Sequence, residues 1–179
     1  EVLHNNILNL QDSMSFNFWI NSNDVDAHQS IINKASPGIS DSWILQLSPG
    51  LNSLKKIWLN CGGLTKFTLL SSPSIVQNNR WYNVVVTYDR QNVKFYIDGV
   101  LDNIYTLSSP TPSNTQNIKI GGLLGEIFNG KIDDIGIWNR ALDSSEVAAL
   151  YTGNICYQTI TVTDTLLINT GILTYNPIT

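Results

Sequence analysis

The sequence is poor in charged residues, which make up 13% of its 179 positions, about half the usual share. Only 10 residues are Lys or Arg, and the net charge of −4 leaves no basic stripe that could neutralise the phosphates of a nucleic acid. Apolar runs stay well short of the roughly 18 residues that a membrane-spanning helix needs. We therefore expect neither nucleic-acid binding nor a membrane span.

Glutamate is almost absent, with three residues in the chain. Glycoside hydrolysis needs two carboxylates that face each other across a groove, and only Glu126 with Asp133 or Asp134 could attempt this. The two histidines lie outside any nucleophile–base motif, and phosphate-loop, metalloprotease and zinc-binding patterns do not occur. The sequence therefore predicts a protein that is not an enzyme.

Cysteine is also scarce, and its only two positions are Cys61 and Cys156. A disulfide between them would close a large loop and contribute about 4–5 kcal/mol in the chain-entropy model. The alternative is two buried free thiols, which a reducing cytosol would keep. The composition favours the disulfide, because a nearly neutral surface with 21 asparagines suits a secreted or cell-surface protein that meets glycans. The first ten residues lack the features of a signal peptide, so we expect any export signal to precede this chain.

The most regular stretch runs from Trp81 to Gly99 (WYNVVVTYDRQNVKFYIDG) and predicts a β-hairpin. Both halves alternate with the period of two that a half-buried strand requires, and Asp98-Gly99 supplies the positive φ of a tight turn. Shorter runs of this kind, separated by Gly and Pro, predict strands near 14–20, 31–32, 43–47, 57–61, 67–70, 101–107, 118–120 and 131–138. This pattern favours an all-β antiparallel sandwich or jelly roll.

One short helix is predicted near residues 144–151. Asp143 can cap its N-terminus, with Glu146 three residues later for a reciprocal capping box, and Gly153 fits the left-handed position after its end. We expect residues 1–154 to form one domain. Residues 155–179 are rich in Thr and Ile, contain no Lys or Arg, and predict either a final strand or a spacer.

Four motifs in this order and spacing resemble a known family. They are Phe16-Asn-Phe-Trp19, Trp81-Tyr-Asn-Val-Val-Val-Thr-Tyr88, Phe95-Tyr-Ile-Asp-Gly99 and Gly130-Lys-Ile-Asp-Asp-Ile-Gly-Ile-Trp-Asn-Arg-Ala-Leu142. Together they are similar to a laminin-G-like domain of the concanavalin A-like lectin/glucanase superfamily, over about residues 8–153. The resemblance implies two packed antiparallel sheets, one of them concave, often with one structural calcium ion.

Two departures from the family pattern affect this expectation. Family members usually begin with a Phe-Asp-Gly-x-x-Asp-Tyr strand that often supplies metal ligands, whereas this chain starts near its end at Glu1-Val2. The tail after Gly153 is similar to the spacers that precede C-terminal sorting domains in secreted bacterial proteins. The Glu-x-Asp-x-x-Glu strand by which glucanases of the superfamily resemble one another does not occur here.

Two groups of residues are candidates for binding a metal ion. Adjacent strand residues point to opposite faces, so one carboxylate of Asp133-Asp134 would point inward and need a cation or several hydrogen-bond donors. The resemblance places this position near the calcium ion, which makes Asp134 or Asp133 its ligand. The alternative is one solvated aspartate and one bonded to loop amides. Asp24, Asp26 and His28 could also hold a metal, or form a solvated acidic turn.

Four residues are candidates for binding carbohydrate. Trp58 lies beside Asn60 on the strand face opposite to the apolar one, where an indole can stack on a sugar ring and an amide can bind its hydroxyls. The alternative is a Trp58 covered by a crossing loop or by the tail. Tyr105 lies near a turn-rich loop, and Trp43 shares its face with two leucines, so that Trp43 is also a core candidate.

These observations lead to two main hypotheses on function, with a glycoside hydrolase as the third and least favoured. The first is a non-catalytic extracellular module that recognises a polysaccharide or cell-surface glycan through a concave sheet or its rim loops. The second is an adhesive or structural module that contacts an extracellular protein or travels as cargo of a bacterial secretion system. Exposure of Trp58 would favour the first, and its burial the second.

Overall fold

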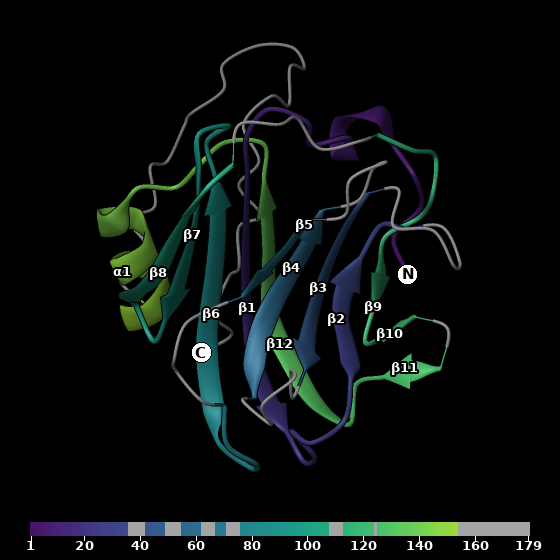
Figure 1. Cartoon of the computed structure of the whole chain (residues 1–179), viewed down its shortest axis with the longest axis vertical. Helices are drawn as coiled ribbons and strands as arrows, with labels where there is room; N and C mark the ends of the chain where they lie inside the picture. Colours follow the sequence, from purple (N-terminus) through teal and green to yellow (C-terminus); the bar gives the residue numbers. More distant parts are fainter. Residues whose placement is uncertain are drawn as a thin grey trace, which may run out of the picture.

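The computed structural model describes residues 1–35, 42–48, 55–61, 67–70, 76–107, 113–123 and 125–153, where two five-stranded antiparallel sheets form two layers (Figure 1). The first sheet has the order β12-β1-β6-β7-β8, with β1 (Met14–Ser22), β6 (Trp81–Tyr88), β7 (Asn92–Ile97), β8 (Val100–Thr106) and β12 (Gly130–Trp138). The second has the order β5-β4-β3-β2-β9, with β2 (Gln29–Asn33), β3 (Trp43–Ser48), β4 (Lys56–Cys61), β5 (Phe67–Leu70) and β9 (Lys119–Ile120). The predicted antiparallel jelly-roll sandwich is confirmed.

The core lies between the two sheets and contains the apolar side chains that alternate along each strand. Phe18, Val84 and Phe95 of the first sheet and Leu45 and Leu59 of the second are fully buried in one cluster. Each such side chain stabilises the fold by about 1.5–3 kcal/mol relative to its exposed state. Since a shift of one residue would turn this set outward, the alternation fixes which side chains remain on the outer faces.

The hairpin predicted from Trp81 to Gly99 is confirmed as β6 and β7, which are neighbours in the first sheet. The next turn joins β7 to β8, where Ile97 pairs with Val100 across Asp98 and Gly99. Both turn residues have positive φ, 51° and 75°, as a two-residue hairpin turn of type I′ requires.

Helix α1 (Ser144–Thr152) is the only α-helix within the described ranges and begins and ends as predicted. The Asp143 side chain accepts hydrogen bonds from the backbone N–H groups of Ser145 and Glu146, and the Glu146 side chain accepts one from the Asp143 N–H. Gly153 follows in the left-handed conformation. The capping box satisfies the N–H groups that a helix start leaves without intrahelical partners.

The same helix covers part of the outer face of the first sheet, beside β7 and β8 in Figure 1. Val147 packs with Val85 and Tyr96 in a second, smaller apolar cluster. Tyr151 stacks on Trp19, with ring centroids 5.8 Å apart. The outer face of the first sheet is therefore partly occupied by the protein itself.

One local expectation was wrong. The sequence predicts no strand between residues 121 and 130, but β11 (Glu126–Ile127) pairs with β10 (Gly122–Leu123) in a short two-stranded sheet. Two-residue strands are too short to produce a detectable alternation, so the glycines on either side dominated the pattern. A 3₁₀ turn, η1 (Asn6–Leu8), also precedes β1.

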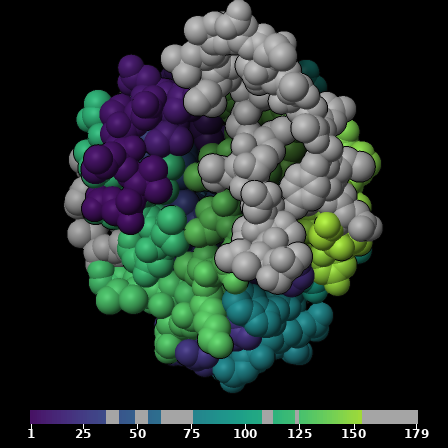
Figure 2. Space-filling model, turned by 180° about the vertical axis from the view of Figure 1, so that it is seen from behind, coloured from purple at the N-terminus to yellow at the C-terminus, as the bar shows by residue number. Residues whose placement is uncertain are grey.

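The N-terminal residues lie against the segment that follows residue 113, as the view from behind shows (Figure 2). Val2 and Ile118 form an isolated antiparallel bridge with two backbone hydrogen bonds. Among the residues that the structure describes, no helix has the length and apolar character to cross a membrane. The predicted strand or spacer at 155–179 lies outside the described residues.

Candidate functional site

The outward face of the second sheet carries Trp58 and Asn60, two of the residues that the sequence indicates as candidates for sugar binding. Ile57 and Leu59 of β4 are buried in the core, so the alternation directs Trp58 and Asn60 to the other face, as predicted. The register places Trp58 opposite Gln46 of β3. Asn60 pairs with Ile44. We call Ile44, Gln46, Trp58 and Asn60 the β3–β4 strip.

Two polar atoms of the β3–β4 strip are buried without a hydrogen bond. Trp58 and Asn60 are both half-buried, and neither Trp58 Nε1 nor Asn60 Oδ1 has a partner in the described part of the chain. A buried polar group without a partner costs about 1–3 kcal/mol, so native proteins retain few of them. One of these atoms is a donor and the other an acceptor, and a hydroxyl group can satisfy either kind.

The neighbours of these two residues add further polar chemistry. Residues that pair directly across two strands have Cβ atoms about 4.5–5.5 Å apart, so the Gln46 amide lies beside the Trp58 ring. Lys56 and Ser48 form the next pair along the same strands. The β3–β4 strip thus combines an aromatic ring with two neutral amides, which can both donate and accept hydrogen bonds.

Trp43 does not belong to this surface, and its assignment as a carbohydrate-binding residue was wrong. Its side chain is only 1% exposed, and its ring lies 4.6 Å from the ring of Phe16 in the core. It faces inward with Leu45 and Leu47, so a ligand on the outer face cannot reach it. The alternation along β3 already favoured this interpretation.

Tyr105 is also placed apart from Trp58. It lies on β8 of the first sheet, half-buried against the core, and meets Phe95 edge to face with ring centroids 6.1 Å apart. The structure therefore does not bring Tyr105 into the β3–β4 strip.

A β-bulge changes the geometry that was expected for Asp133 and Asp134. Asn17 pairs with Gly136 but Trp19 pairs with Asp133, and Asp134 has a φ of +47°. The extra residue in β12 leaves both aspartates exposed, so the expectation that one carboxylate points inward was wrong.

The bulge also occupies some of its own polar groups. The Asp134 carbonyl accepts a hydrogen bond from Asn17 Nδ2 at 2.7 Å, and Asp133 Oδ1 accepts one from the Asp134 N–H. Calcium takes six to eight oxygen ligands. Among the described residues, no three acidic, His or Cys side chains gather into a metal-binding group. The calcium ion stays a prediction that would require oxygens beyond these two carboxylates.

The second metal candidate is an acidic turn with its own partners. Asp26 forms an ion pair with Lys55 at 2.9 Å, and the Asp24 carboxylate accepts the Asp26 N–H. His28 Nε2 lies 3.5 Å from the Ser48 hydroxyl. This geometry is that of the solvated turn, which was the alternative interpretation.

The disulfide stays a prediction. Cys61 ends β4, and only its backbone is described, while Cys156 lies outside the described residues.

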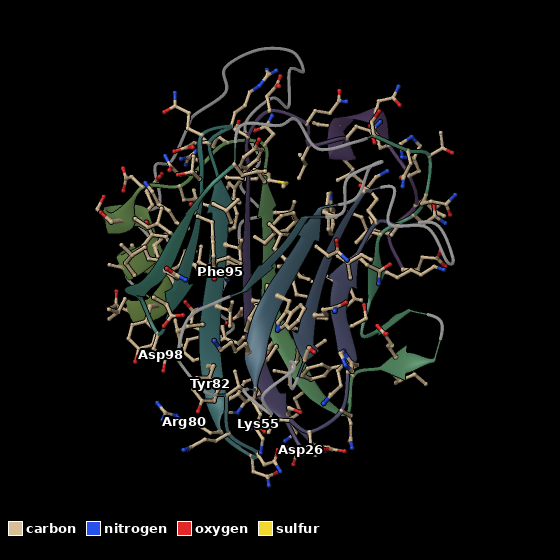
Figure 3. The ribbon with its side chains drawn as sticks, viewed as in Figure 1. Asp26, Lys55, Arg80, Tyr82, Phe95 and Asp98 are labelled. Atoms are coloured by element: carbon tan, nitrogen blue, oxygen red, sulfur yellow. The ribbon has the colours of Figure 1, made fainter. Side chains whose placement is uncertain are left out.

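A pocket of about 290 Å³, which no sequence pattern indicates, lies beside the first residues of β6 and β8. Arg80 and Tyr82 line one side, and Asp98, Leu101 and Asp102 line the other. Figure 3 shows Arg80, Tyr82 and Asp98 grouped at the lower end of the first sheet. These residues lie at or next to the ends of strands and carry no motif of their own. Only the β6–β7 register shows that the start of β6 lies beside the end of β7.

Comparison with known proteins gives one family match. The family model described as the concanavalin A-like lectin/glucanases superfamily matches residues 2–148. A search of the curated proteins found no match.

Several solved structures share the fold. Domain 4 of AbnA, an extracellular GH43 arabinanase from Geobacillus stearothermophilus in complex with arabinotriose, has a TM-score of 0.66 at 20% identity, over 80% of this chain and 68% of that domain. The CBM40 of the Ruminococcus gnavus IT-sialidase, bound to α2,3-sialyllactose, has a TM-score of 0.66 at 17% identity, over 80% of this chain and 85% of that module. A protein from Bacteroides ovatus ATCC 8483, for which carbohydrate binding is proposed, has a TM-score of 0.63 at 19% identity, over 82% of this chain and 43% of that one. At these identities the likeness shows the fold alone.

Proposed function

Because this chain belongs to the concanavalin A-like lectin/glucanases superfamily, we propose that it is a non-catalytic carbohydrate-binding module whose β3–β4 strip contacts the sugar. The observation that carries this proposal is the outward position of Trp58 and Asn60, both half-buried, beside the amide of Gln46. Trp58 Nε1 and Asn60 Oδ1 are buried and have no partner among the described residues, so a sugar hydroxyl can bond to them only when binding uncovers them.

The proposed contact combines stacking with hydrogen bonding. The indole of Trp58 supplies a flat apolar surface for the C–H face of a sugar ring, as aromatic side chains with a polar atom commonly do at interfaces. The amides of Gln46 and Asn60 reach the hydroxyls at the rim of that ring. Each new hydrogen bond contributes about 0.5–1.5 kcal/mol, so several units of a polysaccharide are needed for firm binding.

The structural neighbours support this proposal. The arabinanase domain is in complex with arabinotriose and the sialidase module with α2,3-sialyllactose, and both are parts of larger glycoside-acting proteins. We extend to this chain the role of a binding module in an extracellular protein, where a surface poor in charge would meet glycans.

A glycan array tests the proposal. The panel includes arabinotriose, α2,3-sialyllactose and a range of plant and bacterial polysaccharides, and affinity is then measured by calorimetry on the strongest ligand. Trp58→Phe removes Nε1–H and keeps a ring, so we expect roughly two- to tenfold weaker binding. Trp58→Ala removes both and should weaken the binding of the strongest ligand more than Trp58→Phe does.

The control is Trp81→Phe, which changes an exposed tryptophan of the first sheet and should leave the affinity unchanged. An array without any bound glycan would remove the carbohydrate proposal. An affinity for the strongest ligand that Trp58→Ala leaves unchanged would place the sugar elsewhere.

One observation favours the second candidate, a module that contacts protein. The edge strand β8 exposes Val100, Leu101 and Ile104, and an edge strand with apolar side chains is a surface on which another chain can pair. If the unsubstituted protein bound no glycan on the array, the assignment would shift to this adhesive function or to cargo of a secretion system.

A further inference from the structure

The pocket beside the first residues of β6 and β8 is separate from the β3–β4 strip. It is lined by residues of β6, β7 and β8 and of the segment before β6, and the strip lies on the outer face of the second sheet. Its volume of about 290 Å³ is close to the lower end of small-ligand pockets.

The wall formed by residues 77–80 is held in place by hydrogen bonds to three other parts of the chain. The Gln77 N–H donates to the Tyr82 hydroxyl at 3.1 Å, and the Asn79 N–H donates to the Ser22 carbonyl at 2.7 Å. The Asn78 side chain accepts the Val25 N–H at 2.8 Å. A wall fixed in this way loses little conformational freedom when a ligand binds.

The opposite wall is the turn between β7 and β8, and it is equally constrained. Asp98 exchanges two hydrogen bonds with the backbone of Asn83, one through its N–H and one through Oδ1. A Cβ added to Gly99 would lie 3.0 Å from the Tyr151 side chain, so helix α1 packs closely behind this turn.

Arg80 connects the two walls. Its guanidinium group lies 4.6 Å from the centre of the Tyr82 ring and 3.3 Å from Asp98 Oδ2, and Figure 3 shows the three residues grouped together. The Arg80 side chain remains 58% exposed, which leaves its other N–H groups accessible to a ligand. Asp98 uses one oxygen for Arg80 and the other for Asn83, which makes it a positioning residue.

The lining combines one cation and two carboxylates with apolar side chains. Arg80 and Gln77 supply donors, Asp102 supplies an acceptor, and Ile97 and Leu101 supply apolar surface. The lining residues Arg80, Asp98 and Asp102 carry a formal net charge of −1, which disfavours an acidic ligand. A neutral ring with hydroxyl groups on its edge and C–H groups on its face fits all of these groups.

We infer that this pocket is a second binding site, for one unit of a neutral sugar, which works independently of the β3–β4 strip. Arg80 donates to a hydroxyl of the sugar, Asp102 accepts from another, and the apolar side chains of Ile97 and Leu101 contact the ring. Two such sites on one domain would allow it to hold a polysaccharide at two points.

Amide NMR of the ¹⁵N-labelled protein tests this inference with glucose, galactose, mannose and arabinose as neutral probes and N-acetylneuraminic acid as the acidic probe. We expect at least one neutral sugar to give saturable chemical-shift changes at the amides of Gln77, Asp98 and Leu101. The acidic sugar should give none. Arg80→Gln should weaken that binding about tenfold, because it removes charged hydrogen-bond donors.

Arg90→Gln is the matched control, because Arg90 lies at the other end of the β6–β7 hairpin, is 53% exposed and forms an ion pair with Asp12. It should leave the pocket shifts unchanged. Trp58→Ala should leave them unchanged as well, which separates this site from the β3–β4 strip. Absence of saturable shifts with all four neutral sugars, or equal effects of Arg80→Gln and Arg90→Gln, would overturn the inference.

Discussion

Trp43 and Trp58 lie on neighbouring strands of the second sheet and face opposite ways, so substitution by phenylalanine should separate stability from binding. Trp43 is buried against Phe16, while Trp58 belongs to the outward strip. Both indole nitrogens are buried without a partner in the part of the chain that the structure describes. The same substitution therefore removes the same unpaired group from two different environments.

The change in unfolding free energy for Trp43→Phe follows from two opposing contributions. Phenylalanine buries about 50 Å² less apolar surface than tryptophan, which costs about 1.3 kcal/mol. Removal of a buried N–H without a partner recovers about 1–3 kcal/mol. The two nearly cancel, so we expect a change within about 1–2 kcal/mol. Trp43→Ala leaves a cavity and should cost about 3–5 kcal/mol.

Urea unfolding followed by far-ultraviolet circular dichroism measures both substitutions, and glycan affinity is measured on the same samples. Trp43→Phe should keep both the fold and the affinity, whereas Trp58→Phe should keep the fold and lose affinity. If Trp43→Phe destabilised the protein as much as Trp43→Ala, the Nε1 atom would have a partner and the reasoning would be refuted. A loss of affinity in Trp43→Phe would restore Trp43 as a binding residue.

Three further predictions concern the helix, the β7–β8 turn and the calcium ion. The hydrogen bonds from Arg140 hold the pKa of Glu146 below its ordinary value of 4.5, so their stabilisation is present above that value and lost as the pH falls through the lower folded pKa. The urea midpoint should therefore fall less between neutral and acid pH for Glu146→Gln than for the unsubstituted protein. Parallel curves of midpoint against pH would contradict this. Gly99→Ala should cost more stability than Gly153→Ala, by about 1 kcal/mol or more. Both glycines have positive φ, but only a Cβ at Gly99 would contact Tyr151. Equal losses of unfolding free energy in urea would show that the contact is unimportant. If the calcium prediction is right, a chelator lowers the melting temperature and added calcium restores it, whereas an unchanged melting curve would remove the ion.

The local elements could be predicted because each depends on neighbouring residues in the chain. The alternation from Val84 to Val86 defines a strand, and Asp98-Gly99 defines its turn, through side-chain directions and backbone angles alone. The capping box of α1 likewise needs only Asp143 and Glu146, three residues apart. The outward position of Trp58 follows from its own strand in the same way.

The bulge in β12 could not be predicted, because it depends on pairing with a distant strand. The sequence around Asp133 has the alternation of a regular strand, and only the register against Asn17 and Trp19 shows the extra residue. This one residue decided that both aspartates are exposed. It therefore changed the interpretation of the metal candidate.

The sequence by itself determined the two-sheet sandwich, its helix and the outward placement of Trp58 and Asn60, since period-two burial and turn chemistry are local properties. Only the tertiary structure decided that Tyr105 lies apart from the strip and that Arg80 meets Asp98 at a pocket. The physical reason is that a pocket or a pairing register forms between segments far apart in the chain, and their relative positions are fixed only when the sheets close around a shared core.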